Sequence, residues 1–544
     1  MANLAQNIVK RFDKLYATAT KWRGIWNDCA RYCMPNEAPI KTLGANTDGA
    51  RKKQPLDTTG IEAATKLAAW LYSSTIYQGE QWFSLQAKKK ESNTTDSTLQ
   101  KFLERAARTA LNTIATSNCI KVYQQFLRGY VNFGTGVFYT EISETGDLVC
   151  RQFRITSDIA IAENSKGEVD TVFRRFQYTA RQAVQEFGEE NLPIDVQKAA
   201  ANEKDQDKLF TFIHAVYPRK KRKRGKNTAD NKLFASVYVE VSQNHVVLEG
   251  GYDTFPYCVP RFYNTGEIYG RSPAMSALPA LKAINMAIFC YLRNIEFMSN
   301  PMAFVESENI DKLNIAPGAK NVKSPVGNNP EIWSPHGDIN SPLQFVETKA
   351  NEVRGLFFND VFQYLEDRKN MTATEAQLRY DEMIQGVAPV LANLHEEFFN
   401  PFIRRIVYGL METGVIEVPE TLRAKDGKFP DFDVVYTTRL DTKLKGVLNA
   451  NLLNTYRLLG EIDAIRANSP LAQQFLNDEE TVKLVCANNN TSADLLNDEE
   501  TVATIKEAMA QQAQMTALQG MIDKINLQKT PEKGSAQDTM VNAM

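Results

Sequence analysis

Histidine and cysteine are scarce in this sequence, which has four histidines and seven cysteines among 544 residues. The seven cysteines are spread thinly and odd in number, which fits a reducing compartment. Cys29 and Cys33 lie four residues apart in a predicted helix, but no second pair stands nearby to complete a zinc site. We therefore interpret them as buried thiols that pack in a core. No metal and no other cofactor is expected.

Motifs that carry catalysis are also missing. The sequence has no G-x-x-x-x-G-K-[ST] phosphate loop, no G-x-S-x-G elbow and no H-E-x-x-H pair. The histidines are scattered, at positions His214, His245, His336 and His395. His395 precedes two glutamates, which is typical of a solvated helix surface. An enzyme is therefore not supported. The N-terminus has no apolar core of a secretory signal, so none is expected.

Charge of one sign is not in excess, because 63 basic and 65 acidic residues give a net charge of −2. This balance argues against a protein that coats nucleic acid, since such binding uses many lysine and arginine contacts to phosphates. It leaves room for local basic patches.

No uninterrupted apolar run is long enough to span a membrane. The most apolar segment, residues 273–300, is interrupted by Lys282, Arg293 and Glu296. Its longest charge-free run, 283–292, is about half of the roughly 20 residues that a span requires. We expect instead a helix that begins at Ser272-Pro273 and ends at Asn300-Pro301. Its apolar residues cover more than one stripe, so it packs on several sides or forms the centre of a soluble core.

The first half of the chain changes from helical to strand periodicity. Helices are predicted at 3–33, 61–76, 98–116 and 119–132. After Gly134-Thr135-Gly136 the pattern alternates, and strands are predicted at 137–142, 148–155, 171–178, 210–218, 233–241 and 245–251. A short helix, 180–187, interrupts them. The expected fold class is α+β, mostly helical.

A strongly basic segment joins two of these strands. Seven of its eight residues are basic, namely Arg219, Lys220, Lys221, Arg222, Lys223, Arg224 and Lys226. It is a solvated loop, a contact for nucleic acid or another anionic partner, or a targeting signal.

The second half is predicted to return to helices. Residues 302–345 are rich in turn formers, with strand signals at 303–307, 321–327, 331–335 and 343–347, and a helix is predicted at 349–368. A capping box at 372–375 begins a long helix to 413, which we expect to be kinked near 385–389 by Gly386 and Pro389. Pro401 is a second place for a kink.

The end of the chain is predicted to contain an edge strand at 434–440 and helices at 443–515. The heptapeptide LNDEETV occurs twice, at 476–482 and 496–502, and in each copy the Asn-Asp pair supplies an N-cap and the glutamates fall in the first helical turn. Two short helical hairpin units are the simplest interpretation, and a metal site formed by these acids is the weaker alternative. Residues 521–544 are expected to form a disordered tail.

Two motifs in fixed order carry a family resemblance. They are GEIYGRSPAMSALPALKAINMA, after residue 265, and MTATEAQLRYDEMIQGVAPVLANLHEEFFNPFIRRIV, after residue 370. The sequence resembles the portal proteins, or head-to-tail connectors, of short-tailed double-stranded DNA phages, over roughly residues 5–515. The residues that carry the motifs are Gly266, Tyr269, Gly270, Arg271, Ser272, Pro273, Thr372 and Glu375.

The resemblance implies a ring, of twelve subunits in the family, at one capsid vertex. It implies domains in the order wing (1–260), turn and first stem helix (261–301), clip (302–345), second stem helix (346–368), channel loop (369–374), long kinked wing helix (375–414) and helical crown (415–520). DNA would be packaged and ejected through the ring.

The implied partners are double-stranded DNA, a terminase, tail adaptor proteins, and major capsid and scaffold proteins, with no membrane. The implied location is the portal vertex of the virion, with assembly in the host cytoplasm. Arg368, Lys369 and Asn370 would touch the DNA backbone without reading bases. The alternative is another ring- or shell-forming structural protein of a virion.

Overall fold

The structure is a computed structural model, and it divides the chain into two units that are described separately. The described residues are 2–37, 54–76, 81–88, 97–219, 231–306, 314–323, 331–333, 340–359, 386–422, 429–436, 452–459, 461, 481–482, 485 and 499–529. The first unit comprises Met1–Ser84 and Ala106–Asp441, and the second comprises Leu85–Arg105 and Thr442–Met544. Helices and antiparallel sheets occur together, which confirms the mostly helical α+β class.

The predicted N-terminal helices are confirmed to within two residues. They are α1 (Ala2–Cys33), α2 (Thr59–Thr75), α3 (Ser97–Thr116) and α4 (Cys119–Phe133), with a short 3-10 turn η1 (Pro35–Glu37) after α1. Cys29 and Cys33 are buried, as the packing interpretation requires. The described residues contain no cluster of three potential metal ligands.

A five-stranded antiparallel sheet forms the body of the first unit. Its order is β4 (Ile159–Glu163), β5 (Val169–Thr179), β6 (Leu209–Pro218), β7 (Phe234–Glu240) and β8 (His245–Tyr252). Strand β4 was not predicted, because its sequence, IAIAE, is short and follows β3 after only four residues. Strands β5 to β8 were predicted from alternating apolar and polar residues, and the structure confirms them.

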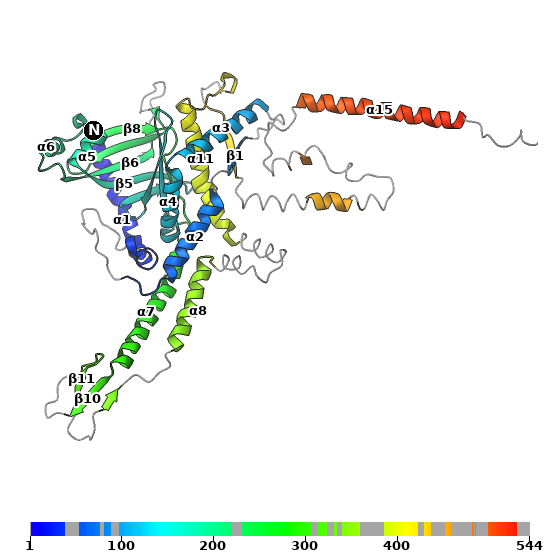
Figure 1. Ribbon diagram of the computed structural model, residues 1–544. Coiled ribbons are helices and arrows are strands. Elements are labelled where there is room, and N and C mark those ends of the chain that lie inside the picture. Colours follow the sequence, from blue (N-terminus) through cyan, green and yellow to red (C-terminus); the bar gives the residue numbers. More distant parts are fainter. Residues whose placement is uncertain are drawn as a thin grey trace, which may run out of the picture. The chain divides into compact units, whose positions relative to one another are not determined.

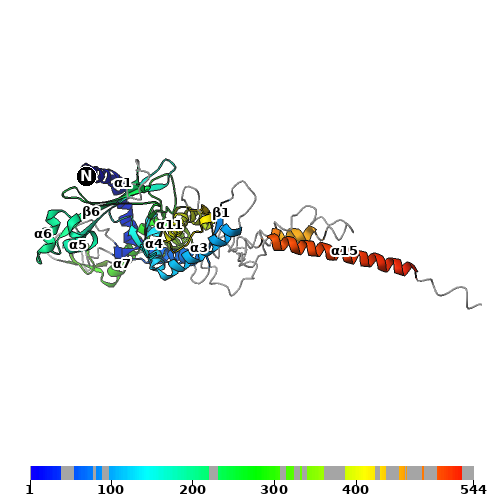
Figure 2. The same cartoon turned by 90° about the horizontal axis from the view of Figure 1, so that it is seen from above.

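The two faces of this sheet are covered by different helices (Figures 1 and 2). Ile8 and Phe12 of α1 pack on one face against Phe173 and Ile213. The opposite face is covered by α5 (Ala180–Phe187), which was predicted, a 3-10 turn η2 (Glu189–Asn191) and α6 (Ile194–Ala201), which was not. Because successive side chains of a strand point to opposite faces, this one sheet contributes to two hydrophobic cores.

A smaller sheet follows α4 directly. Its order is β3 (Leu148–Arg154), β2 (Gly136–Ile142) and β9 (Tyr257–Cys258). Gly134 ends α4 with a φ of 73°, a conformation that glycine adopts without steric cost, and β2 begins two residues later.

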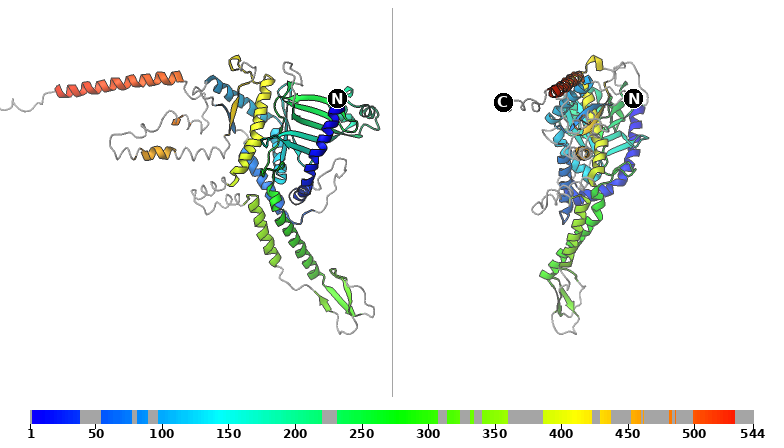
Figure 3. Two further views of the ribbon diagram at one scale, coloured as in Figure 1. Left: turned by 180° about the vertical axis from the view of Figure 1, so that it is seen from behind. Right: turned by 90° about the vertical axis from the view of Figure 1, so that its right-hand side faces the viewer.

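Two long helices, α7 (Pro273–Ser299) and α8 (Asn340–Leu356), run antiparallel side by side (Figures 1 and 3). Between them in sequence, β10 (Met302–Glu306) pairs in parallel with β11 (Lys320–Lys323) and antiparallel with β12 (Glu331–Trp333). The prediction for α7 is confirmed at both ends. Three of the four strand signals after it are confirmed as well.

The prediction for the second helix of the pair was wrong. It begins at Asn340 and not at Lys349, so the fourth strand signal, 343–347, is helical. Pro342 is tolerated there because it lies in the first helical turn, where its nitrogen needs no partner. The helix also ends early, at Leu356, and Phe358 takes a φ of 58°. Residues 360–368 lie outside the described residues.

The helical segment 386–394 continues through a π-helical turn, η5 (His395–Phe399), into α11 (Asn400–Glu412). Residues 386–389 are helical, and the rest of the predicted kink region lies outside the described residues. At the second predicted kink the π turn comes directly before Pro401, which sits in the first turn of α11. A 3-10 turn η6 (Glu420–Leu422) and the strands β1 (Phe83–Ala87) and β13 (Phe432–Tyr436) complete the assignments, and β13 begins two residues before its predicted start.

The second unit contains a helical segment at 452–459 and the helix α15 (Glu499–Lys529). The second LNDEETV copy begins α15 at its first glutamate, as predicted. The disordered tail predicted from residue 521 is contradicted, because 521–529 continue the helix. These residues include no glycine or proline and several good helix formers. Residues 530–544 lie outside the described residues.

Candidate functional site: the junction at the first turn of helix α7

Two glycines let the body of the first unit and the turn before α7 touch backbone to backbone. A Cβ atom on Gly270 would lie 2.4 Å from the carbonyl oxygen of Gly134 and 2.7 Å from the Cβ of Arg261. The Gly270 N–H also donates to the Thr135 hydroxyl at 2.8 Å. Any side chain at position 270 would therefore separate the two segments.

Ser272 fastens α7 to α4. Its hydroxyl oxygen accepts from the Met275 N–H at 3.1 Å, so it caps α7 as predicted, and the same hydroxyl donates to the Asn132 carbonyl at 2.9 Å. Pro273 is the first helical residue, where its missing N–H costs nothing. One buried hydroxyl thus fixes both the start and the direction of α7.

Aromatic residues connect the same turn to α1. The Tyr269 ring lies 5.4 Å from that of Trp26 and 5.9 Å from that of Trp22, and the Arg271 guanidinium lies 5.0 Å above Trp22. Burial raises the pKa of Tyr269 above its usual range, so its hydroxyl stays protonated. Arg271 also donates to Glu267 at 2.9 Å, and this bond lowers the pKa of the exposed Glu267 carboxyl.

Arg261 is the residue of this site that sequence reasoning missed. Its backbone N–H and its Nη2 both donate to the carboxylate of Glu397, at 2.7 and 2.6 Å. Nη1 pairs with Glu163 on β4, and Nη2 also donates to the Gly167 carbonyl at 2.8 Å. The Arg261 side chain is 4% exposed, so one nearly buried cation links the sheet, the junction and the π turn.

The π turn explains why Glu397 reaches Arg261. His395 and its two glutamates were expected on a solvated helix surface, and for Glu397 this expectation was wrong, because its side chain is only 21% exposed and pairs with Arg261. Phe398 and Phe399 on the same turn are buried against Tyr123 of α4, with ring centroids 5.3 and 5.8 Å away. An extra residue per turn is the geometry of a π helix, which sequence periodicity does not reveal.

The described motif residues Gly266, Tyr269, Gly270, Arg271, Ser272 and Pro273 all lie in this junction. Gly266 takes a φ of 80° in the turn. Thr372, Glu375 and the predicted channel residues Arg368, Lys369 and Asn370 lie outside the described residues. Of the basic segment, only Arg219 is described. It donates to Glu249 at 3.1 Å and to the Gly250 carbonyl at 3.2 Å, so its side chain is held on β8.

The first half of α7 is buried and its second half is exposed. Ala274, Ala277, Leu281 and Ile284 are buried, and α7 packs on α1, α2 and α4. Beyond Ile284, the exposed apolar side chains are Met286, Phe289, Leu292, Ile295 and Met298. On α8, Ala350 and Val353 are buried while Leu343, Phe345 and Leu356 are exposed, and Phe357, directly after the helix, is buried.

By length and composition alone, α7 is apolar enough to cross a membrane, and it is the one such helix among the described residues. The charges that interrupt it therefore do not exclude a span by themselves. Lys282 donates to Asp28 of α1 at 2.5 Å, and most residues of α7 before Lys282, among them Ala274, Ala277 and Leu281, are buried by other parts of the protein.

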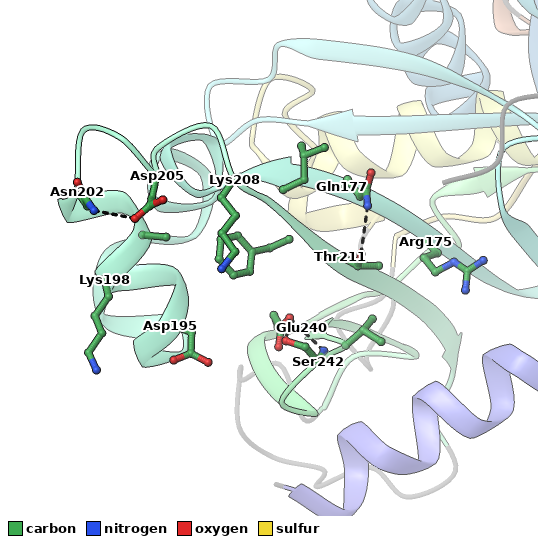
Figure 4. Close-up of a pocket in the computed structure, with 14 residues that line it drawn as sticks. Arg175, Gln177, Asp195, Lys198, Asn202, Asp205, Lys208, Thr211, Glu240 and Ser242 are labelled. Carbon is green, nitrogen blue, oxygen red and sulfur yellow. Dashed lines mark hydrogen bonds between the residues drawn. The ribbon is translucent and has the colours of Figure 1, made fainter. Parts of the chain in front are cut away.

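A polar groove of about 870 Å³ lies beside α6 and the β7–β8 turn (Figure 4). Arg175, Lys198 and Lys208 line it, together with three carboxylates. Glu240 accepts from the Ser242 hydroxyl at 2.6 Å and Asp205 accepts from Asn202 at 2.7 Å, so these carboxylates are already satisfied. No predicted site residue lines the groove.

Comparison with known proteins shows the family to which the chain belongs. Residues 5–496 match the family model described as bacteriophage head to tail connecting protein, and the chain belongs to this family. It is 26% identical over 422 residues to the probable portal protein of Bordetella phage BPP-1, covering 76% of this chain and 75% of that protein. It is 23% identical over 528 residues to the portal protein of Salmonella phage epsilon15, covering 95% and 93%. The chain accordingly has a phage portal role, which is structural and not enzymatic.

Proposed function

We propose that the chain forms a closed ring at one capsid vertex, with α7 and α8 of each copy packed between those of its neighbours. The observation that carries this proposal is the exposed apolar surface of α7 beyond Ile284. A helix that is covered on one side by α8 and exposes Phe289, Leu292 and Ile295 elsewhere leaves a large apolar surface in water. A repeated head-to-tail contact buries such a surface on both flanks of each subunit.

Burying these apolar side chains is expected to release enough free energy to hold a ring together. Fully burying a large apolar side chain gives about 1.5–3 kcal/mol. The side chains of Met286, Phe289, Leu292, Ile295 and Met298 are already 37–64% buried, being 63, 50, 44, 36 and 45% exposed. Covering the exposed part of all five therefore supplies about 4–7 kcal/mol per subunit, and the two contacts of each subunit reinforce one another when the ring closes.

In this proposal α7 and α8 form the stem, and the sheet β10–β12 forms the clip. The α+β body with α1–α4 forms the wing, and the part of the second unit that follows residue 441 belongs to the crown. Because α8 begins at Asn340, the boundary between the clip and the second stem helix shifts from residues 345 and 346 to Asn340. Twelve copies, a double-stranded DNA passenger, a terminase, tail adaptors, and capsid and scaffold proteins complete the assembly, which forms in the host cytoplasm and ends at the virion vertex.

For the channel, we keep the proposal that Arg368, Lys369 and Asn370 touch the DNA backbone. Few cations suit a passage through which DNA must slide, because many phosphate contacts would hold it. The double variant Arg368→Ala and Lys369→Ala should change the length or retention of the packaged genome. Unchanged packaging would count against the contact.

For the basic segment, we propose that Lys220 to Lys226 contact packaged DNA or scaffold. Arg219 is not part of that contact, since it is committed to Glu249. Neutralising Lys220, Lys221, Arg222, Lys223 and Arg224 should weaken packaging or scaffold incorporation, and normal yields would show a solvated loop only.

The ring is tested by electron microscopy and sedimentation of the purified full-length protein. We expect rings with a central hole for the native chain and loss of rings for Phe289→Glu with Leu292→Glu, because each would bury a charge at the contact. Ile194→Glu is the matched control, since Ile194 is 63% exposed on α6 and lies outside the proposed contact. Icosahedral shells or sheets from the native chain would favour the alternative structural role.

A further inference from the structure

Two buried cysteines from different elements come together where α4 meets β3. Cys119 is the first residue of α4 and Cys150 lies within β3, and both are buried and free. The side chain of Asn118 accepts from the Cys150 N–H at 2.8 Å and donates to the Cys150 carbonyl at 2.9 Å. These two bonds fasten the start of α4 beside the backbone of Cys150.

The two thiols also act on each other. A hydrogen bond with the Cys119 thiol, together with burial, raises the pKa of Cys150 above its usual range. The thiolate is the reactive form of cysteine, so a thiol that stays protonated and buried reacts slowly with oxidants. The pair therefore remains reduced as long as the surroundings are reducing.

The other buried cysteines among the described residues are spaced wrongly for a disulfide with their nearest thiols. A disulfide needs Cα atoms within about 7 Å and Cβ atoms about 4 Å apart. Cys258 is on β9, and β2 lies between β9 and β3, so two interstrand spacings of roughly 4.8 Å separate it from Cys150. Cys29 and Cys33 are four residues apart on α1, where Cβ atoms lie about 5–6 Å apart.

We propose that Cys119 and Cys150 form a disulfide when the protein meets a small uncharged oxidant such as hydrogen peroxide. One sulfur attacks a peroxide oxygen, which breaks the O–O bond, releases one water and leaves a sulfenic acid. The second sulfur attacks the sulfenic sulfur, so the S–S bond forms and a second water leaves. The two thiols lose two electrons and two protons, and the peroxide is reduced to water.

This disulfide would join α4 to β3 covalently. It closes a loop over residues 119–150, and such a cross-link stabilises a fold mainly by restricting the unfolded chain. The other end of α4 holds the junction, because the Asn132 carbonyl accepts from Ser272. Oxidising surroundings come with the place of the chain in a released virion. That setting rests on the proposed function, whereas the pairing is a property of the folded chain.

The test uses the purified full-length protein with Cys290→Ser and Cys486→Ser, because the exposed thiol of Cys290 would form disulfides between molecules. The protein is treated with hydrogen peroxide, the remaining thiols are blocked with iodoacetamide under denaturing conditions, and the peptides are analysed by mass spectrometry. We expect one disulfide-linked pair of peptides, Cys119 with Cys150, and free thiols at the other buried cysteines.

Unfolding in urea provides a second readout. In the treated protein, dithiothreitol should lower the urea concentration at the midpoint, since it cuts the disulfide and leaves oxidised methionines as they are. Cys119→Ser should abolish both the linked peptides and this effect of dithiothreitol. Cys258→Ser is the matched control, because it removes an equally buried thiol from the same small sheet, and it should keep both.

A link between Cys150 and Cys258, or sulfenic and higher acids at Cys119 and Cys150 without a link, would overturn the inference. So would a pair that stays reduced under a treatment that fully oxidises the exposed Cys290 of the native chain. These outcomes leave the ring untouched, because microscopy decides on the ring separately.

Discussion

Replacing Gly270 with alanine should destabilise the first unit strongly, although the change adds one methyl group. The added Cβ would lie 2.4 Å from the Gly134 carbonyl oxygen and 3.0 Å from the Cα of Arg261, where ordinary contacts begin near 3.4 Å. Both neighbours are backbone atoms, so no side-chain rotation can relieve the clash. Overpacking of this kind costs about 1–3 kcal/mol.

Moving the two segments apart would relieve the clash, but it would weaken two hydrogen bonds between them. The Gly270 N–H bond to Thr135 and the Phe262 N–H bond to the Gly134 carbonyl, at 2.8 Å each, would lengthen or break. Each contributes about 1 kcal/mol. We therefore expect Gly270→Ala to lower the free energy of unfolding by about 3–5 kcal/mol. Gly134→Ala should cost about 1 kcal/mol more, because Gly134 also has a φ of 73°.

Gly129→Ala is the matched control. Gly129 lies inside α4, and a Cβ there meets no atom within 4 Å. Alanine is the better helix former, so this variant should be stabilised by about 0.5–1 kcal/mol. Urea unfolding, followed by tryptophan fluorescence at one protein concentration, compares them, since Trp22 and Trp26 contact Tyr269 in the same turn. If Gly270→Ala unfolds at the same urea concentration as Gly129→Ala, the backbone contact is refuted.

Two further substitutions test the chemistry of the junction and of the sheet. Arg261→Met should lower the free energy of unfolding by about 2–4 kcal/mol in urea unfolding, because it leaves Glu163 and Glu397 without their cation. Arg271→Met breaks only a half-exposed pair and a ring contact and should cost much less; equal costs would contradict the role given to Arg261. Burial lowers the pKa of His214, which bonds to Tyr257 and Ser236, so below about pH 6.5 the unfolded chain takes up a proton that the folded chain does not, and stability should fall by up to about 1.4 kcal/mol per pH unit. His214→Gln should reduce that slope between pH 6.5 and 5, and an unchanged slope would show that other groups cause it.

The sequence predicted those elements whose periodicity and end signals agree. Helix α7 has Ser272 as its cap, proline at its first position and Asn300-Pro301 at its end, and all three signals were visible in the sequence. The alternating strands β5 to β8 were found in the same way. Elements without such agreement were missed, as with the short β4 and with α6, which follows Pro193 and has no side-chain cap.

The errors have local causes. The sequence of residues 343–347, LQFVE, is compatible with a strand or a helix. These residues are helical because they follow a helix start at Asn340, with Pro342 in the first turn. The early end of α8 has no sequence signal, because a bulky residue such as Phe358 rarely takes a positive φ. The apolar pattern of Val361, Phe362 and Leu365 therefore predicted a longer helix.

The candidate site was predicted in its motif and not in its centre. Glycine, serine and proline at 270–273 signalled a tight turn and a helix start. The link between Arg261 and Glu397 joins residues 136 positions apart in sequence, and it depends on a π turn that periodicity does not show. Long-range ion pairs of this kind leave no local pattern to read.

The central claim is that this chain assembles as a ring through the exposed surface of α7. The most direct measurement is electron microscopy of the purified full-length protein, classified by symmetry, for the native chain and for Phe289→Glu with Leu292→Glu. We predict closed rings with a hole wide enough for a DNA double helix in the native chain, and separate subunits in the variant. Rings that persist in the variant, or a native chain without rings, would contradict the account.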